Sequence, residues 1–129
     1  MAAYTHKNLG DVKNMAPQFG IEGGFEARFA RGDLEAERTA VSYQHLPPDT
    51  QSPFGHRHQE AEEVYVVLRG SGRMKLGDDV IEVAELDAIR VSPEVPRAFA
   101  AGSEGLTVLA VGQHHENDGE MLQDFVVED

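Results

Sequence analysis

Apolar residues in this chain come in short runs that alternate with polar residues and are separated by turn signals. The runs predict β-strands over residues 25–30, 38–45, 64–69, 73–76, 80–83, 88–92, 97–100 and 106–111. Short strands at this spacing are typical of an all-β sandwich or barrel, with helix as a minority element. The pattern therefore predicts one antiparallel β domain.

Proline and glycine clusters mark the turns between these runs. Pro47 and Pro48 end the second strand because proline cannot donate to a β-ladder. The segments Gly70-Ser71-Gly72 and Gly77-Asp78-Asp79 predict tight hairpins, since glycine supplies the positive φ that such turns need. Residues 102–105 predict another turn of the same kind.

The two ends of the chain carry weaker signals. Residues 8–15 predict a short N-terminal helix that is capped by Asn8 or Asp11 and ended by Pro17. The acidic residues 116–129 near the C-terminus either add an edge strand or lie over the surface.

A chain of 129 residues has room for one domain only. Within it we expect an N-terminal segment with the first strands at 1–38, a barrel core at 39–112 and an acidic C-terminal tail at 113–129.

The residues best suited to bind a metal ion lie in the segment from His56 to Gly70. His56 and His58 are two residues apart, so in an extended chain their side chains face the same way. Imidazole and carboxylate are ligands that divalent ions accept. Strict alternation favours Glu62 as the carboxylate ligand, whereas a turn or bulge after His58 would bring Glu63 inward instead. Both carboxylates remain candidates at this point.

This stretch resembles the first motif of the cupin superfamily, which is Gly, five residues, His-x-His, three or four residues, Glu, six residues and Gly. His56, His58, Glu63 and Gly70 match it, while Thr50 stands in place of the first glycine. The resemblance covers residues 39–112 and implies a double-stranded β-helix, a jelly-roll-like antiparallel barrel. It also implies a homodimer and a metal held by the two histidines and Glu63.

The second cupin motif, Gly-x5-Pro-x-Gly-x2-His-x3-Asn, is eroded, and Arg97 aligns with its histidine. A guanidinium is always protonated and cannot bind a cation. At an effective dielectric constant of 20 and about 4 Å, a divalent ion repels it by roughly 8 kcal/mol and a carboxylate attracts it by roughly 4 kcal/mol. An inward Arg97 would therefore compete with a metal for Glu63. If it points to solvent or to a substrate carboxylate, a three-ligand site remains.

Other residues near the motif are candidates for a pocket. Tyr65 follows Glu63 by two residues and Phe99 follows Arg97 by two, so both either line the pocket or fill the barrel core. Gln44 and its two neighbours lie on the preceding strand, whose register the sequence leaves open. We take Arg97, Tyr65, Phe99 and Gln44 as substrate-binding candidates, and Tyr65 and Arg97 as catalytic candidates.

Composition narrows the class of partner. A formal net charge of -12 repels polyanions, so neither a nucleic acid nor an anionic membrane is expected as a partner. The chain has no cysteine, no apolar run long enough to span a membrane and no apolar signal-peptide core, and we expect it in the cytoplasm. No nucleotide-binding fingerprint is present, so no nucleotide cofactor is expected.

A second possible cluster of metal ligands is His114-His115-Glu116. We expect these residues to lie on the surface, because adjacent histidines face opposite ways and Asn117-Asp118-Gly119 looks like a solvent loop.

Three functions fit these residues. The first is a metal-dependent dioxygenase or isomerase, with Fe, Mn, Ni or Zn on His56, His58 and Glu63 and with Arg97 orienting a small anionic substrate. The second is a metal-free, epimerase-like enzyme with a histidine as base and Tyr65 as acid. The third is a module that binds or senses a small ligand without turnover.

Overall fold

Strands dominate the computed structural model, which describes residues 3–128. In that range they are β1 (Glu26–Phe29), β2 (Thr39–Leu46), β3 (Gly55–His58), β4 (Glu63–Leu76), β5 (Asp79–Ala84), β6 (Ala88–Val91), β7 (Arg97–Gln113) and β8 (Gly119–Leu122). The helical elements are the 3-10 turns η1 (Leu9–Asp11) and η2 (Ala16–Phe19) and the single turn α1 (Arg31–Leu34). The predicted all-β class is therefore confirmed.

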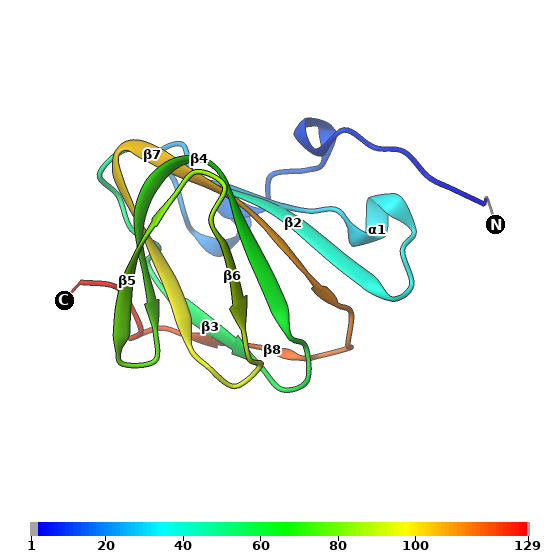
Figure 1. Cartoon of the computed structure of the whole chain (residues 1–129). Helices are drawn as coiled ribbons and strands as arrows, with labels where there is room; N and C mark the ends of the chain where they lie inside the picture. The colour runs from blue at the N-terminus through cyan, green and yellow to red at the C-terminus, as the bar shows by residue number, and fades with distance from the viewer. Residues whose placement is uncertain (1–2, 129) are drawn as a thin grey trace.

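All strand pairings are antiparallel and form one curled sheet (Figure 1). The order along one path is β1-β2-β7-β3-β8, and β4 pairs with β5, β6 and β7. The long strands β4 and β7 curve together over one end of the molecule, so that the sheet rolls around a shared interior. This is the rolled antiparallel barrel expected from the sequence.

Two of the predicted hairpins are wrong, because β4 and β7 each continue through the segment expected to turn. Gly70 and Gly72 lie at register shifts in the β4–β7 ladder. A Cβ added to either would come within 2.0 Å of a carbonyl oxygen of β7, that of Gly105 or that of Ala100. Glycine here allows two paired strands to bend in close contact. The predicted hairpin at Gly77 is confirmed, since it joins β4 to β5 with a φ of 59°.

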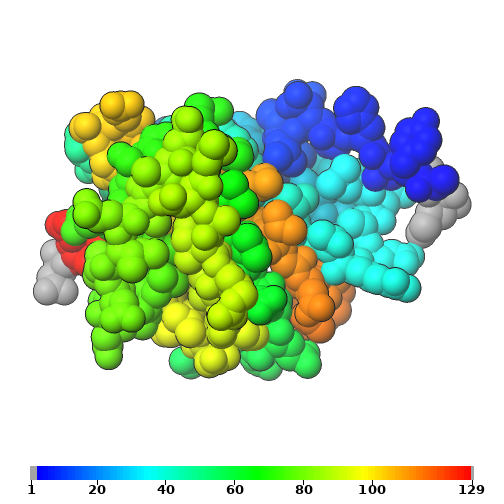
Figure 2. All heavy atoms as spheres, in the orientation of Figure 1, coloured from blue at the N-terminus to red at the C-terminus, as the bar shows by residue number. Residues whose placement is uncertain are grey.

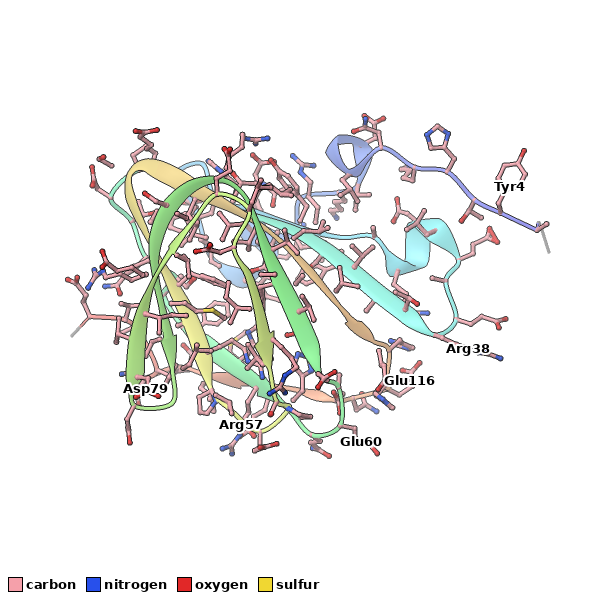
Figure 3. All side chains as sticks on the ribbon, viewed as in Figure 1. Tyr4, Arg38, Arg57, Glu60, Asp79 and Glu116 are labelled. Atoms are coloured by element: carbon pink, nitrogen blue, oxygen red, sulfur yellow. The ribbon has the colours of Figure 1, made fainter. Side chains whose placement is uncertain are left out.

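The barrel interior is filled by side chains from the long strands. Its buried members are Leu46, Tyr65, Val67, Met74, Val83, Val91, Phe99, Leu106, Val108 and Ala110. Charged side chains such as Arg38, Glu60 and Asp79 point away from this interior (Figure 3). β3 and β8 pair at one end of the barrel (Figure 1).

The predicted single helix over residues 8–15 is wrong, since this segment contains only the 3-10 turn η1, and η2 begins directly after it. Asn8 does cap η1 as expected, by accepting the N–H of Gly10. Asn14 then interrupts the segment, because its Oδ1 accepts the N–H groups of both Ala16 and Ala27. These bonds tie the chain to β1 and replace the bonds of a continuous helix. Residues 3–8 lie beside α1 (Figure 2), where the Thr5 hydroxyl donates to the carbonyl of Leu34.

The acidic tail adds an edge strand, the first of the two alternatives left open by the sequence. β8 pairs with β3 over four positions, from Gly55↔Leu122 to His58↔Gly119. The sequence pattern did not predict β3, because this strand is short and polar. Most of its pairing partners lie in β8, far along the chain. Across residues 3–128, none of the helices has the length and hydropathy that a membrane crossing requires.

Candidate metal centre

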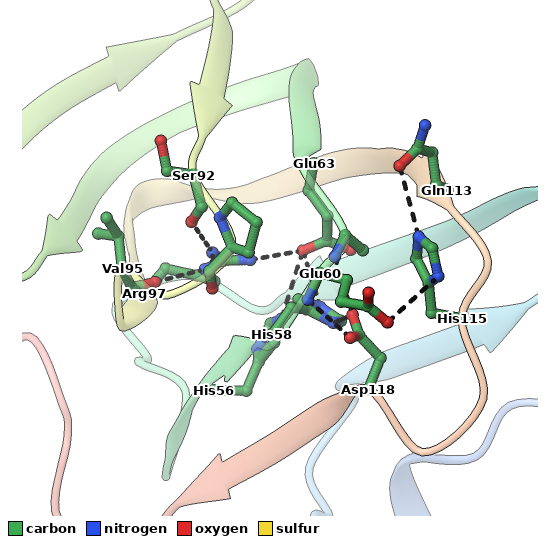
Figure 4. A network of polar contacts seen from close by, with 12 residues as sticks. His56, His58, Glu60, Glu63, Ser92, Val95, Arg97, Gln113, His115 and Asp118 are labelled. Atoms are coloured by element: carbon green, nitrogen blue, oxygen red, sulfur yellow. Dashed lines mark hydrogen bonds and ion pairs between the residues drawn. The ribbon is translucent and has the colours of Figure 1, made fainter.

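Two histidines and a glutamate converge where β3 meets β4 (Figure 4). The Nε2 atoms of His56 and His58 lie 3.5 and 3.2 Å from Oε1 of Glu63. One potential ligand atom from each residue lies within 4.8 Å of the other two. Ligands bound to one ion at about 2.1 Å are separated by roughly 3.0–3.4 Å, so the spacing is close to that of a coordination shell.

The carboxylate that faces the histidines is Glu63. The chain turns after β3, which resets the alternation, and Glu63 pairs with Gly112 on the inner side of the barrel. Glu62 lies on the surface, 3.3 Å from Arg90, and Glu60 is exposed near His115. The turn between the two strands thus decides between the two carboxylates that the sequence left open.

Asp118 orients the ring of His58, and sequence reasoning missed it. Its Oδ2 lies 3.0 Å from Nδ1 of His58, and its carboxylate also accepts the N–H groups of Glu60 and Ala61. The expectation of a solvent loop around Asp118 is wrong, because only 6% of this residue is exposed. No local pattern could have revealed it, since it meets His58 from the connection just before β8, 60 residues further along the chain.

The hydrogen bond to Asp118 leaves the other nitrogen of His58 without a partner. With the proton on Nδ1, Nε2 presents a lone pair, yet it is buried and makes no hydrogen bond within the described residues. A lone pair that faces a carboxylate at 3.2 Å needs a cation or a proton between them. The residues present therefore fit a metal ion at this position.

Arg97, the first residue of β7, lies inside the barrel and not toward solvent. Its side chain is fully buried, and its Nη1 donates to Glu63 Oε1 at 2.8 Å. Its Nε and Nη2 donate to the carbonyl groups of Ser92, Pro93 and Val95. A bidentate contact with a substrate carboxylate stays a prediction, and it would require Arg97 to release bonds that it makes here.

Tyr65 completes the hydrogen bonds around Glu63. Its hydroxyl donates to Oε1 at 2.6 Å and lies 3.3 Å from Nε2 of His56, while Phe99 packs edge-on against its ring. Because Arg97 and Tyr65 both donate to Oε1, they would compete with a metal ion for this oxygen. The two side chains hold the carboxylate in place.

The electrostatics of this cluster favour an ionised Glu63. Burial favours its neutral form, but the nearby imidazoles of His56 and His58 and the hydrogen bond from Tyr65 outweigh burial and hold the pKa of Glu63 well below its usual range. The Glu63 carboxylate in turn raises the pKa of His58. Burial and the nearby negative charge raise the pKa of Tyr65 far above 10.0, so Tyr65 remains a neutral donor.

These shifts predict how the stability of the metal-free protein depends on pH. The lowered pKa of Glu63 stabilises the fold above the ordinary value of 4.5, and this contribution is lost as the pH falls below it. The raised pKa of His58 stabilises the fold below 6.5, and this contribution is lost as the pH rises above that value. Urea unfolding in chelator should therefore show maximal stability between about pH 5 and 6. Glu63→Gln should flatten both limbs, and an unchanged profile would contradict this account.

A cavity of about 530 Å³ adjoins the cluster. Among the substrate-binding candidates, Gln44, Phe99 and Arg97 line it. Gln44 pairs with Val108, which is fully buried, so Gln44 faces inward. Its neighbour Tyr43 faces outward and accepts a hydrogen bond from Arg69.

In the described part of the chain, His114 and His115 form no second metal-binding group. His114 contacts the carboxylate of Glu116, and His115 contacts that of Glu60.

Comparison with known proteins identifies the family. Residues 42–112 match the family described as Cupin domain. The chain belongs to the cupin family. An uncharacterised protein of Methanocaldococcus jannaschii is 31% identical over 71 residues, which are 53% of this chain and 57% of that protein. The cupin described here thus spans little more than half of that relative.

Solved structures agree with the cupin fold. A cupin protein from Bacteroides fragilis aligns over 100% of both chains, with 24% identity and a TM-score of 0.72. Oxalate decarboxylase from Bacillus subtilis aligns with 96% of this cupin but 33% of its own chain, with 25% identity and a TM-score of 0.77. These similarities support the barrel architecture predicted from the first motif.

Proposed function

We propose that this cupin binds a divalent metal through His56, His58 and Glu63 and acts on a small molecule held in the adjoining cavity. The observation that carries the proposal is the buried Nε2 of His58, which has no hydrogen-bond partner and faces the Glu63 carboxylate at 3.2 Å. Two imidazoles and one carboxylate suit Fe, Mn, Ni or Zn.

Each residue around the trio has a defined task in this proposal. Asp118 holds the His58 ring so that Nε2 faces the site, and Arg97 and Tyr65 hold the Glu63 carboxylate. A bound metal would supply Lewis acidity or activation of oxygen, which corresponds to isomerase or oxygenase chemistry. Three protein ligands leave coordination positions free for a substrate.

Arg97 weakens metal binding without abolishing it. Its positive charge opposes a cation, but three backbone carbonyl groups surround the guanidinium and offset part of that charge. We therefore propose that the metal affinity is lower than that of a cupin site with a fourth histidine.

A metal-free acid–base enzyme is the second candidate, and the contacts of Tyr65 support it. The hydroxyl of Tyr65 connects Glu63 to His56, at 2.6 and 3.3 Å, as in a chain that passes protons. The raised pKa of Tyr65 opposes this role, since it favours a donor that keeps its proton. This candidate predicts full activity in chelator, and a non-catalytic binding module predicts ligand binding without turnover.

Metal analysis of the wild-type protein tests the proposal. Protein purified without added metal should contain close to one divalent ion per chain, and chelator should lower its melting temperature. Adding back the ion at 100 times its Kd should restore about 2.7 kcal/mol of stability, because the ion binds the folded state. Metal-free protein whose melting temperature is unchanged by Fe, Mn, Ni and Zn would exclude a metal site.

A further inference from the structure

Three phenylalanines from separate parts of the chain gather at the cavity beside the trio. Phe19 belongs to η2, Phe29 ends β1 and Phe54 precedes β3, and we call these three the aromatic rim. The ring of Phe19 lies edge-on to those of Phe29 and Phe54, with centroids 6.3 and 6.4 Å apart. Phe19 and Phe29 are 44% and 48% exposed. The rim is therefore an accessible apolar surface.

The strand register makes the aromatic rim continuous with the candidate metal centre. In the ladder of β1 with β2, Phe29 pairs with Ser42 and Ala27 pairs with Gln44. On the other side of β2, Ser42 and Gln44 pair with buried residues of β7. Side chains directly opposite one another share a face, so this face of β1 and β2 extends the inner wall of the barrel. The wall reaches from the rim to His58 within one cavity.

Most of the charged groups along this cavity are paired with an opposite charge within the protein, and Arg31 makes a hydrogen bond to the backbone. Arg97 donates to Glu63 and to backbone carbonyl groups, and Arg31 donates to the carbonyl of Ala36. The carboxylates of Glu26 and Glu120 pair with Arg28 and Arg57. A phosphate or a dicarboxylate would have to break such pairs and would meet a chain of net charge -12.

We propose that the cavity takes a largely apolar, ring-containing compound that packs against the aromatic rim and presents one oxygen donor toward the trio. This inference rests on the proposed metal site, which would bind the oxygen. The cavity volume of about 530 Å³ lies in the usual range for drug-sized ligands. Edge-on packing of ligand rings on phenylalanine adds to the gain from burying apolar surface.

A second copy of the chain is the competing occupant of the rim. A protein surface could cover the exposed rings of Phe19 and Phe29, but it would leave the cavity that runs inward from them to His58 unfilled. A small molecule with an apolar body and an oxygen donor satisfies both ends of the cavity. The geometry therefore favours a small molecule.

Calorimetric titration with 2-naphthol as a probe, against oxalate and glucose 6-phosphate, tests the inference. The metal-loaded protein should bind 2-naphthol more tightly than either anion. Phe19→Ala should weaken 2-naphthol binding by about five- to tenfold. Tyr4→Ala removes an aromatic ring that is 84% exposed and lies outside this cavity, and it should leave binding unchanged (Figure 3).

Several results would overturn the inference. One is that oxalate or glucose 6-phosphate binds more tightly than 2-naphthol. Another is that 2-naphthol does not bind up to its solubility limit. A third is that Phe19→Ala dissociates a dimer and leaves the affinity for 2-naphthol unchanged. Repeating the titration in chelator separates this inference from the proposed function. Unchanged rim-dependent binding in chelator would support the apolar body of the ligand and contradict its contact with a metal.

Discussion

Replacing Arg97 with methionine is expected to lower the free energy of unfolding of the metal-free protein by about 3–5 kcal/mol. The substitution removes the partner of a buried carboxylate, since Glu63 is 16% exposed and Arg97 is fully buried. It also takes the hydrogen-bond donors away from the carbonyl groups of Ser92, Pro93 and Val95. Methionine retains most of the apolar stem, so little of the loss comes from packing. Urea unfolding in chelator at pH 7 measures the change.

Arg90→Met is the matched control. Arg90 also pairs with a glutamate, Glu62, but both side chains are more than half exposed. Its loss should change the stability by less than about 0.5 kcal/mol. Added metal should reduce the defect of Arg97→Met, because the ion replaces the missing positive charge beside Glu63. If both substitutions lower the free energy of unfolding equally, burial of the Arg97–Glu63 pair does not account for its contribution to stability.

Replacing His58 with alanine is expected to weaken metal binding by more than about 100-fold. The substitution removes one of three ligands, whereas loss of a residue that merely orients a ligand costs about 10- to 100-fold. Asp118→Asn keeps the ligand but weakens the bond that orients it, so its effect should fall in that lower range. Competition with a fluorescent chelator measures all affinities on one scale.

His115→Ala controls for the loss of a histidine elsewhere. His115 lies 3.7 Å from the exposed Glu60 and belongs to no metal-binding group found in residues 3–128. Its substitution should leave the affinity unchanged. If His58→Ala and His115→Ala behave alike, the metal is bound elsewhere or not at all.

The eroded second motif acquires a structural explanation in this fold. Arg97 aligns with the family histidine and still points inward, directly opposite His56 in the ladder. Here it holds Glu63 instead of serving as a ligand. A metal bound here would therefore share its carboxylate with a permanent positive charge, and we expect it to be held less tightly than in a cupin site with a fourth histidine.

The sequence alone determined the features that depend on local spacing. The two-residue period of the apolar runs predicted most of the strands, and β1, β2, β5 and β6 lie close to the expected bounds. The step from His56 to His58 placed both rings on one side, because alternation is a property of any extended chain. The resemblance to the first cupin motif then predicted the barrel, which the comparisons confirm.

Only the tertiary structure decided the features that depend on distant pairing. The bend at Gly70 replaces a hairpin because β7 continues alongside β4, and Glu63 faces the histidines because the preceding turn resets the alternation. Arg97 is held inside by the carboxylate and carbonyl groups around it, and Asp118 reaches His58 from the connection that leads into β8. Local sequence patterns determine the direction in which neighbouring side chains point. Contacts between distant segments determine which residues those side chains touch.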